Sequence, residues 1–223
     1  MPQEPFTFER DYIKTMRLEY LRYLPKTYGT EPGKKWPLIP FLHGAGERGA
    51  DLELVKVHGI PKVAESLDLP FVCLSPQCPP NHWWSDFLPA LDDLVTGAVA
   101  SLDVDPNRVY LTGLSMGGYG TWHLASTYPN RFAAIAPICG GGAWFYGFPE
   151  AVCALKNTPT WVFHGAQDNV VNIGESQELV DALKACGGDV AFTIYPEAGH
   201  DSWSETYNNP ALYEWFLSHR LEH

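Results

Sequence analysis

The sequence predicts an α/β fold in which a mainly parallel sheet carries helices on both faces. From about residue 37 onward, short apolar runs typical of strands alternate with stretches whose apolar residues recur at helical spacing. This alternation is typical of βαβ units, whose strands run parallel. Several of the strand-like runs lead directly into loops that contain glycine, histidine or an acidic residue. Ligands of parallel sheets bind at the carboxyl ends of the strands, so we expect the functional residues in these loops.

The first expected element is a half-exposed strand over residues 16–24, where apolar and charged side chains alternate for most of the length. A turn that contains glycines and prolines follows over 28–37. Further strands are expected over 37–42, 71–75, 108–112, 132–138, 160–163 and 191–195. Pro40 weakens the first of these, because proline donates no hydrogen bond to a sheet ladder.

Helices are expected over 88–102, 116–128, 173–186 and 210–220. Pro129 follows the second of them, and Gly187 and Gly188 end the third, where glycine is a common C-cap. No internal repeat or long linker divides the chain. A length of 223 residues therefore predicts a single domain, over residues 1–220, that is large enough to be catalytic.

Composition excludes several classes of protein. Hydrophobic residues make up 45% of the chain and charged residues 18%, which is incompatible with wholesale disorder. No apolar run approaches the ~20 residues of a membrane helix, so no membrane partner is expected. The net charge is −11 and the basic residues form no stripe, so nucleic acid is not an expected partner either. We expect a monomer or a small homo-oligomer.

The five cysteines are an odd number, so at least one is unpaired, and one internal disulfide fits without the sequence fixing its pair. Residues 221–223 (Leu-Glu-His) look like the remnant of an expression tag, and Met1 like an added start. A cytoplasmic and a secreted location both fit.

The strongest chemical signal is GLSMGG at residues 113–118, between an expected strand and an expected helix. A serine hydroxyl is a poor nucleophile that must be exposed, oriented and relieved of its proton. A tight turn from strand to helix lifts the hydroxyl of Ser115 above the sheet, and glycines on either side remove Cβ atoms that would clash. The alternative is a glycine-rich turn with an incidental serine. The flanking elements favour Ser115 as a nucleophile.

A nucleophilic serine needs a base and an acid that orients it. His200 follows the last expected strand, and Asp168 follows the strand at 160–163. The order serine, aspartate, histidine is that of α/β-hydrolases. Asp168 would hold the imidazole in the required tautomer; its structural alternative is to close an Asx turn. Glu197 is the spare acid, and His164, at the end of a strand, is expected to make hydrogen bonds within its loop.

The loop LHGAGERG at residues 42–49 also follows a strand. Acyl transfer places negative charge on the carbonyl oxygen, which backbone N–H groups stabilise. We expect this oxyanion hole to combine the N–H of Met116 with that of Ala45. His43 is expected to brace the loop. The loop lacks the Lys-Ser/Thr ending of a phosphate-binding P-loop.

Taken together, the segments 42–49, 113–122, 164–168 (HGAQD) and 199–203 (GHDSW) resemble the compact bacterial carboxylesterases of the α/β-hydrolase superfamily. They are most similar to the phospholipase/carboxylesterase and feruloyl-esterase-like group, some of whose members carry the label "predicted peptidase". The similarity runs from about Tyr20 to the closing helix. It implies a triad of Ser115, Asp168 and His200, with Ala45 and Met116 at the oxyanion hole.

The substrate is expected to be a small-molecule or polysaccharide-linked ester. Residues 139–159, where many relatives insert a cap, fall short of the ~50 residues of a separate small domain, so we expect an open site. Trp84, Trp144 and Trp203 lie in the loops and would suit acetyl or aromatic, feruloyl-type acyl groups; the alternative is that they only pack the loops.

Two other functions are compatible with the fold. A serine peptidase or amidase would use the same triad, whereas a non-catalytic module would be expected to lack one of its residues. The sequence contains no metal-binding pattern and no dinucleotide fingerprint, so neither a metal nor a cofactor is expected.

Overall fold

The computed structural model describes residues 3–11, 13–143 and 145–222. Its centre is a seven-stranded sheet in the order β1-β3-β2-β4-β5-β6-β7. The strands are β1 (Glu19–Tyr23), β2 (Trp36–Leu42), β3 (Val72–Gln77), β4 (Val104–Leu114), β5 (Ala134–Ile138), β6 (Thr160–Gly165) and β7 (Val190–Tyr195). Only the pairing of β1 with β3 is antiparallel. The expected mainly parallel α/β sheet is therefore confirmed.

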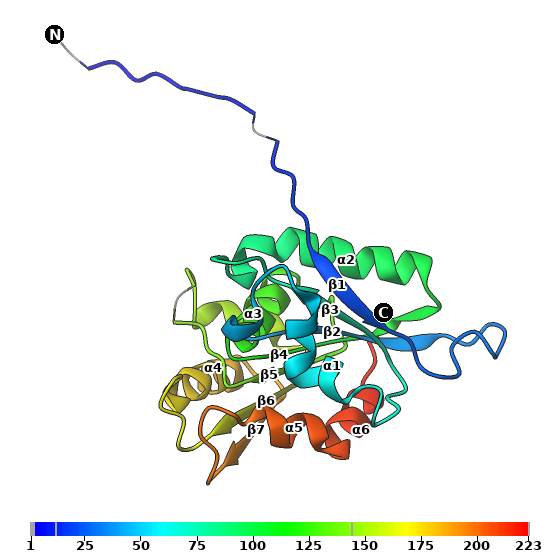
Figure 1. Ribbon diagram of the computed structural model, residues 1–223. Helices are drawn as coiled ribbons and strands as arrows, with labels where there is room; N and C mark the ends of the chain where they lie inside the picture. Colours follow the sequence, from blue (N-terminus) through cyan, green and yellow to red (C-terminus); the bar gives the residue numbers. More distant parts are fainter. Residues whose placement is uncertain (1–2, 12, 144, 223) are drawn as a thin grey trace.

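The helices are α1 (Gly59–Val63), α2 (Leu88–Ser101), α3 (Met116–Thr127), α4 (Ile173–Ala185), α5 (Trp203–Asn208) and α6 (Pro210–Ser218). Short 3₁₀ helices are η1 (Ala45–Glu47), η2 (Leu52–Val57), η3 (Trp84–Phe87) and η4 (Glu150–Leu155). Figure 1 shows α2 on one side of the twisted sheet and α5 and α6 on the other. None of the described helices combines the length and the apolar character that crossing a membrane would require.

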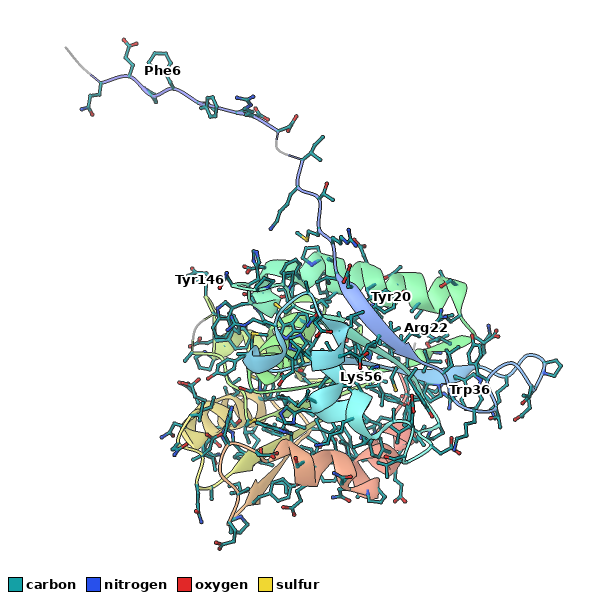
Figure 2. The ribbon with its side chains drawn as sticks, in the orientation of Figure 1. Phe6, Tyr20, Arg22, Trp36, Lys56 and Tyr146 are labelled. Atoms are coloured by element: carbon teal, nitrogen blue, oxygen red, sulfur yellow. A yellow bond between two sulfur atoms is a disulfide. The ribbon has the colours of Figure 1, made fainter. Side chains whose placement is uncertain are left out.

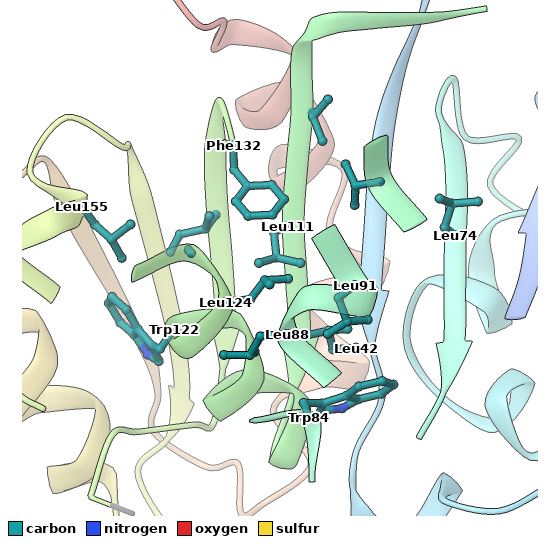
Figure 3. Packing of buried hydrophobic residues seen from close by; sticks show 14 of the residues in the cluster. Leu42, Leu74, Trp84, Leu88, Leu91, Leu111, Trp122, Leu124, Phe132 and Leu155 are labelled. Atoms are coloured by element: carbon teal, nitrogen blue, oxygen red, sulfur yellow. The ribbon is translucent and has the colours of Figure 1, made fainter. Parts of the chain in front are cut away.

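Two hydrophobic clusters hold these layers together. One lies under α2, α3 and α4. It includes Trp84, Leu111, Trp122 and Phe132, which Figure 3 shows among the buried side chains of this cluster. The other lies under α1, α5 and α6 and includes Phe41, Tyr207 and Phe216 among its members. Because the sheet is covered on both faces, β2 and β3 are buried along their whole length.

The sequence missed two of the helices. The α1 helix has five residues and α5 has six, too few to show helical periodicity. Pro40 lies inside β2, which is a central strand rather than an edge strand. Its missing N–H is tolerated where β2 leaves its short ladder with β3, which ends at the pair Pro40–Leu74.

A disulfide joins Cys153 in η4 to Cys186 at the end of α4. Cys73, Cys78 and Cys139 are free and buried. Residues 3–11 extend away from the sheet, and Phe6 among them is 90% exposed (Figure 2). At the other end, the N–H of Leu221 donates to the carbonyl oxygen of Asn107.

Candidate active site

Ser115 occupies the sharp turn between β4 and α3. Its backbone has φ 52° and ψ −118°, a conformation that residues other than glycine rarely adopt. The turn is held from below, where the N–H of Ser115 donates to the carbonyl oxygen of Ile138 at 2.9 Å. The strained backbone directs the side chain out of the carboxyl end of the sheet, as the sequence pattern predicts.

The glycines beside Ser115 are required by close backbone contact. A Cβ atom at Gly117 would overlap the carbonyl oxygen of Leu42, and one at Gly113 would overlap the carbonyl oxygen of Gly117. The turn therefore rests directly against the end of β2. The backbone of Gly117 lies too close to the carbonyl oxygen of Leu42 for any residue with a Cβ atom to replace the glycine without a shift of the backbone.

The structure brings Ser115, His200 and Asp168 together from three separate loops. Nε2 of His200 lies 2.9 Å from the Oγ of Ser115, and Nδ1 lies 2.7 Å from Oδ2 of Asp168. The His200 side chain is 19% exposed and that of Asp168 is fully buried. A proton can therefore pass from the serine to a histidine whose other nitrogen is held by a carboxylate.

The Asp168 carboxylate is saturated with hydrogen-bond donors. Its Oδ1 accepts the N–H groups of Val170 and Val171, both at 2.9 Å. Burial raises the pKa of Asp168, but the hydrogen bonds from His200, Val171 and Val170 outweigh burial and leave the pKa below its usual value. The Asx turn considered as the structural alternative is thus present together with the contact to His200.

The loop after β2 carries Ala45 at the first position of η1, and Met116 is at the first position of α3. The N–H groups at the start of a helix have no acceptor within it and are free to bind a ligand. His43 braces the loop: its Nδ1 donates to the carbonyl oxygen of Gly44 at 2.6 Å, and its Nε2 accepts the N–H of Cys78 at 2.9 Å. Burial lowers the pKa of His43 to about 4, so the ring is neutral.

Of the three tryptophans expected to line the site, Trp84 does not. It is 1% exposed, and its indole N–H donates to the carbonyl oxygen of His43 at 3.0 Å. Figure 3 shows it among the buried apolar side chains. Trp84 therefore supports the loop after β2 from the core, because η3 turns its side chain inward. Its neighbour Trp83 is 46% exposed, and the guanidinium of Arg48 lies 5.8 Å above its ring.

Trp203 is 9% exposed and packs edge-on against His200, with ring centroids 5.2 Å apart. It supports the position of the histidine ring more than it forms an open wall. Trp144 lies outside the described residues. Its neighbour Phe145 packs against Tyr119, which is one turn along α3 from Ser115, with centroids 6.3 Å apart.

Sequence reasoning missed two contacts at this site. His164 lies near the end of β6 and makes the expected hydrogen bond within its loop, to the carbonyl oxygen of Val171 at 3.0 Å, but its Nε2 also lies 3.2 Å from Oδ2 of Asp168. Ser176, on α4, contacts the other nitrogen of His164 at 2.8 Å. The HGAQD segment placed His164 four residues before Asp168, but nothing in the sequence indicated that Ser176 lies beside it.

Among the residues that the structure describes, one group of side chains has the atom types of metal ligands. The ligand atoms of Cys139, Asp168 and His200 lie within 4.8 Å of one another. Burial raises the pKa of the Cys139 thiol to about 12, so it is protonated at neutral pH. Asp168 and His200 are already hydrogen-bonded to each other. The arrangement fits proton transfer and not a metal centre.

Comparison with known proteins places this geometry in a family. The profile of the phospholipase/carboxylesterase family matches residues 83–210, which include Ser115, Asp168 and His200. The chain belongs to the phospholipase/carboxylesterase family. The expected membership of the α/β-hydrolase superfamily is confirmed.

Relatives of this phospholipase/carboxylesterase family member are enzymes that act on esters. A poly(3-hydroxyoctanoate) depolymerase of Pseudomonas fluorescens is 27% identical over 216 residues, which cover 86% of this chain and 77% of the depolymerase. An acyl-protein thioesterase 1 of Gibberella zeae is 29% identical over 106 residues, covering 45% of this chain and 44% of the thioesterase.

Among solved structures, a thermostable esterase superposes with a TM-score of 0.77 and 36% identity, covering 91% of this chain. This chain spans 59% of the length of that esterase. A ferulic acid esterase shares the fold at 18% identity, with a TM-score of 0.64 and coverage of 87% of this chain and 89% of its own. The expected enzyme class, a hydrolase of carboxylic esters, is confirmed; the identity of the acyl group is a separate matter.

Proposed function

We propose that the protein is a serine carboxylesterase that cleaves short-chain or aromatic esters through an acyl-enzyme. The observation that carries the proposal is the His200 ring, which contacts the Ser115 hydroxyl through one nitrogen and the Asp168 carboxylate through the other. This is the arrangement that nucleophilic catalysis by serine requires.

In the first half of the reaction, Oγ of Ser115 attacks the ester carbonyl carbon while Nε2 of His200 takes the hydroxyl proton. The resulting tetrahedral intermediate collapses, the C–O bond to the leaving alcohol breaks, and His200 returns the proton to that oxygen. In the second half, His200 takes a proton from the water molecule that attacks the acyl-enzyme. The bond between the acyl carbon and Oγ of Ser115 then breaks, His200 returns the proton to Oγ, and the carboxylic acid leaves. Asp168 remains ionised and stabilises the imidazolium in both halves.

The oxyanion is proposed to lie between the N–H groups of Ala45 and Met116. Both come from segments fixed by other contacts: the Ala45 loop by His43, and Met116 by the turn at Ser115. Donors that are already oriented need no reorganisation as charge develops on the carbonyl oxygen.

The proposed preference for an aromatic or short acyl group rests on two aromatic side chains, the exposed Trp83 and the half-buried Phe145. Trp83 is held beside the Ala45 loop through Arg48, whose guanidinium donates to the carbonyl oxygens of Ala45 at 3.0 Å and His82 at 3.3 Å. Phe145 approaches from the connection that follows β5. Planar apolar walls with few polar groups suit aryl acyl chains.

A panel of esters with acetyl, butyryl, octanoyl and feruloyl groups, together with a 3-hydroxyoctanoate oligomer, tests the substrate class. We expect the highest kcat/KM with the acetyl or feruloyl ester. If the octanoyl ester or the oligomer gave the highest kcat/KM, the proposed preference for short-chain or aromatic acyl groups would be wrong. If no ester were cleaved, the proposed carboxylesterase function would be overturned. A matched anilide distinguishes an amidase, which would cleave it as readily as the ester.

The Trp83→Ala variant tests the aromatic wall. We expect it to lower kcat/KM for the feruloyl ester by about fivefold and to change that for the acetyl ester little, since one aromatic contact is worth about 1 kcal/mol. The control is Tyr20→Ala, which removes an exposed aromatic side chain from β1. Equal losses on both esters would show that Trp83 does not contact the acyl group.

A further inference from the structure

Three arginines in the described part of the chain are half-buried, and two of them have a carboxylate partner. Nε of Arg108 donates to Asp105 at 2.9 Å, and Nε of Arg131 donates to Asp92 at 2.8 Å. The third, Arg48 in the loop after β2, forms no ion pair with any described residue. Because a charge that is partly removed from water is costly without an anion beside it, Arg48 differs from the other two.

Arg48 is held in a fixed orientation by two carbonyl oxygens. Its Nε donates to Ala45 at 3.0 Å, and its Nη1 donates to His82 at 3.3 Å. A guanidinium has five N–H groups, so one on Nη1 and both on Nη2 have no acceptor among the described residues. Carbonyl oxygens carry no net charge, so the positive charge of Arg48 is not neutralised by these contacts.

Two acidic side chains in the same loops are turned to other partners. Oδ2 of Asp86 lies 3.0 Å from Nδ1 of His82. The carboxylate of Glu47 is largely buried, and its Oε1 lies 3.8 Å from Nε2 of His58. Neither acid forms an ion pair with Arg48, although both belong to the segments that Arg48 touches or adjoins. The unused N–H groups of Arg48 are therefore left for a ligand.

Arg48 lies at the mouth of the proposed active site. The carbonyl oxygen that it contacts belongs to Ala45, whose N–H is one of the two proposed oxyanion donors. The ring of Trp83, which is 46% exposed, lies 5.8 Å from the guanidinium. The charge of Arg48 also contributes, after burial, to the lowered pKa of His43 beneath the loop. A group bound by Arg48 would thus lie beside an ester whose carbonyl oxygen occupies the oxyanion hole.

We propose that Arg48 binds an ionised carboxylate of the substrate, so that the enzyme prefers esters that carry a second, free acid group. This inference rests on the proposed function, because it places the ester carbonyl at Ala45. The carboxylate takes the unused N–H groups of Arg48, and an aromatic part of the substrate lies along Trp83. Arginine suits this task, because it is charged at every relevant pH and its planar fork of donors matches a carboxylate.

The overall charge of the protein makes this local cation matter more. A chain with a net charge of −11 repels an anionic substrate at long range. A neutral ester meets no such repulsion and gains nothing from a guanidinium. Arg48 therefore separates two classes of ester that the triad itself treats alike.

Two pairs of esters test the preference in the wild-type protein. The first pair is 4-acetoxybenzoate and 4-acetoxybenzamide, which differ in the alcohol part. The second is the monophenyl ester of terephthalic acid and phenyl 4-carbamoylbenzoate, which differ in the acyl part. In each pair a carboxamide replaces the carboxylate, so the shape is kept and the charge is removed.

We expect kcat/KM for the carboxylate to exceed that for the carboxamide by about tenfold in at least one pair, as for a charge-assisted hydrogen bond. The pair that shows the preference tells which part of the substrate faces Arg48. If both carboxamides are cleaved as fast as the carboxylates, the inference about Arg48 is overturned and the carboxylesterase function is not. If the wild type cleaves no ester, the proposed function itself fails.

Variants then assign the preference to Arg48. Loss of the contact with Ala45 lowers the rate with both members of a pair, so the measured quantity is the ratio of their kcat/KM values. Arg48→Gln should lower the ratio of carboxylate to carboxamide by about tenfold, and Arg48→Lys, which keeps the charge, should recover part of it. The matched control is Arg22→Gln, which removes an exposed arginine from β1 (Figure 2) and should leave the ratio unchanged.

Two results of this series would overturn the proposal. One is an unchanged ratio in Arg48→Gln. The other is a ratio in Arg48→Lys no higher than in Arg48→Gln, because the loss would then come from the disturbed loop and not from the missing charge.

Salt dependence tests the same contact without any variant. Raising NaCl from about 50 to about 500 mM should lower the wild-type kcat/KM for the preferred carboxylate ester several-fold and change that for its carboxamide little, because salt screens a partly exposed ion pair. If no cation bound the substrate, salt would only screen the repulsion by the net charge, and kcat/KM would rise. A constant or rising value for the carboxylate ester would therefore overturn the proposal.

Discussion

The hydroxyl of Ser115 and the imidazole of His200 are separated by 85 positions along the chain but by 2.9 Å in space. The turn that carries Ser115 and the loop that carries His200 follow β4 and β7, which lie three places apart in the sheet. Asp168 follows β6, between them and next to β7. Each side chain leaves the same carboxyl edge, so the parallel sheet itself brings the three side chains together.

Replacing Ser115 with alanine should lower kcat for p-nitrophenyl acetate by at least ~10³, because the nucleophile is lost while the rest of the site remains. The measurement is steady-state hydrolysis, and labelling by a fluorophosphonate should disappear in parallel. The backbone at residue 115 has positive φ with either side chain, so the melting temperature should change little. Hydrolysis close to the wild-type rate would remove Ser115 from the mechanism.

Replacing Asp168 with asparagine should lower kcat by about 10³–10⁴. The amide oxygen can still accept the N–H groups of Val170 and Val171, but the amide N–H₂ then faces Nδ1 of His200 and favours the wrong tautomer of the ring. Glu197→Gln, which changes the spare acid, is the matched control and should leave kcat within about twofold. A large loss of kcat in Glu197→Gln with little loss in Asp168→Asn would show that Glu197, and not Asp168, is the acid that orients His200.

Gly117→Ala should destabilise the protein by about 2–3 kcal/mol and abolish most activity, because the added methyl group meets the carbonyl oxygen of Leu42, which is rigid backbone. The control is Gly97→Ala in α2, where nothing lies within 4 Å of the new Cβ atom. That variant should gain about 0.5–1 kcal/mol from better helix propensity. Urea denaturation measures both, and equal stability of the two variants would contradict the close contact.

Acid should weaken the fold through His43. The pKa is 6.5 in the unfolded chain and about 4 in the folded protein. Between these values the unfolded chain binds the extra proton, so the free energy of unfolding rises with pH there and falls as pH drops from 6.5 to 4. The loss due to this residue is about 3 kcal/mol.

Denaturation curves at several pH values would measure this effect, with His43→Asn for comparison. The variant should be less stable at pH 7 and should lose less stability on acidification than the wild type. Parallel curves for the two proteins would show that His43 does not carry the pH dependence.

Local pattern was enough to predict much of this molecule. The strands from β2 to β7 and the four longer helices each have an apolar pattern that survives in the fold, and the triad candidates follow because strand ends share one edge. Trp84 shows the limit: η3 turns one of two adjacent tryptophans into the core and leaves Trp83 outside. Because η3 has only four residues, the sequence shows no periodic pattern that would tell which tryptophan points inward.

Contacts between distant segments were beyond prediction. The pairing of Cys153 with Cys186 depends on η4 packing beside the end of α4. The hydrogen bonds among His164, Ser176 and Gly140 join three elements that have no shared sequence pattern. Such contacts come from the tertiary fold, which residue spacing does not encode.

The contact of Gly117 with the end of β2 couples two parts of the site that perform different tasks. The turn that presents the nucleophile and the loop that would receive the oxyanion share one backbone surface, so neither can shift without displacing the other. Engineering of new specificity in this scaffold should therefore leave both segments intact and diversify the surface around Trp83 and Phe145.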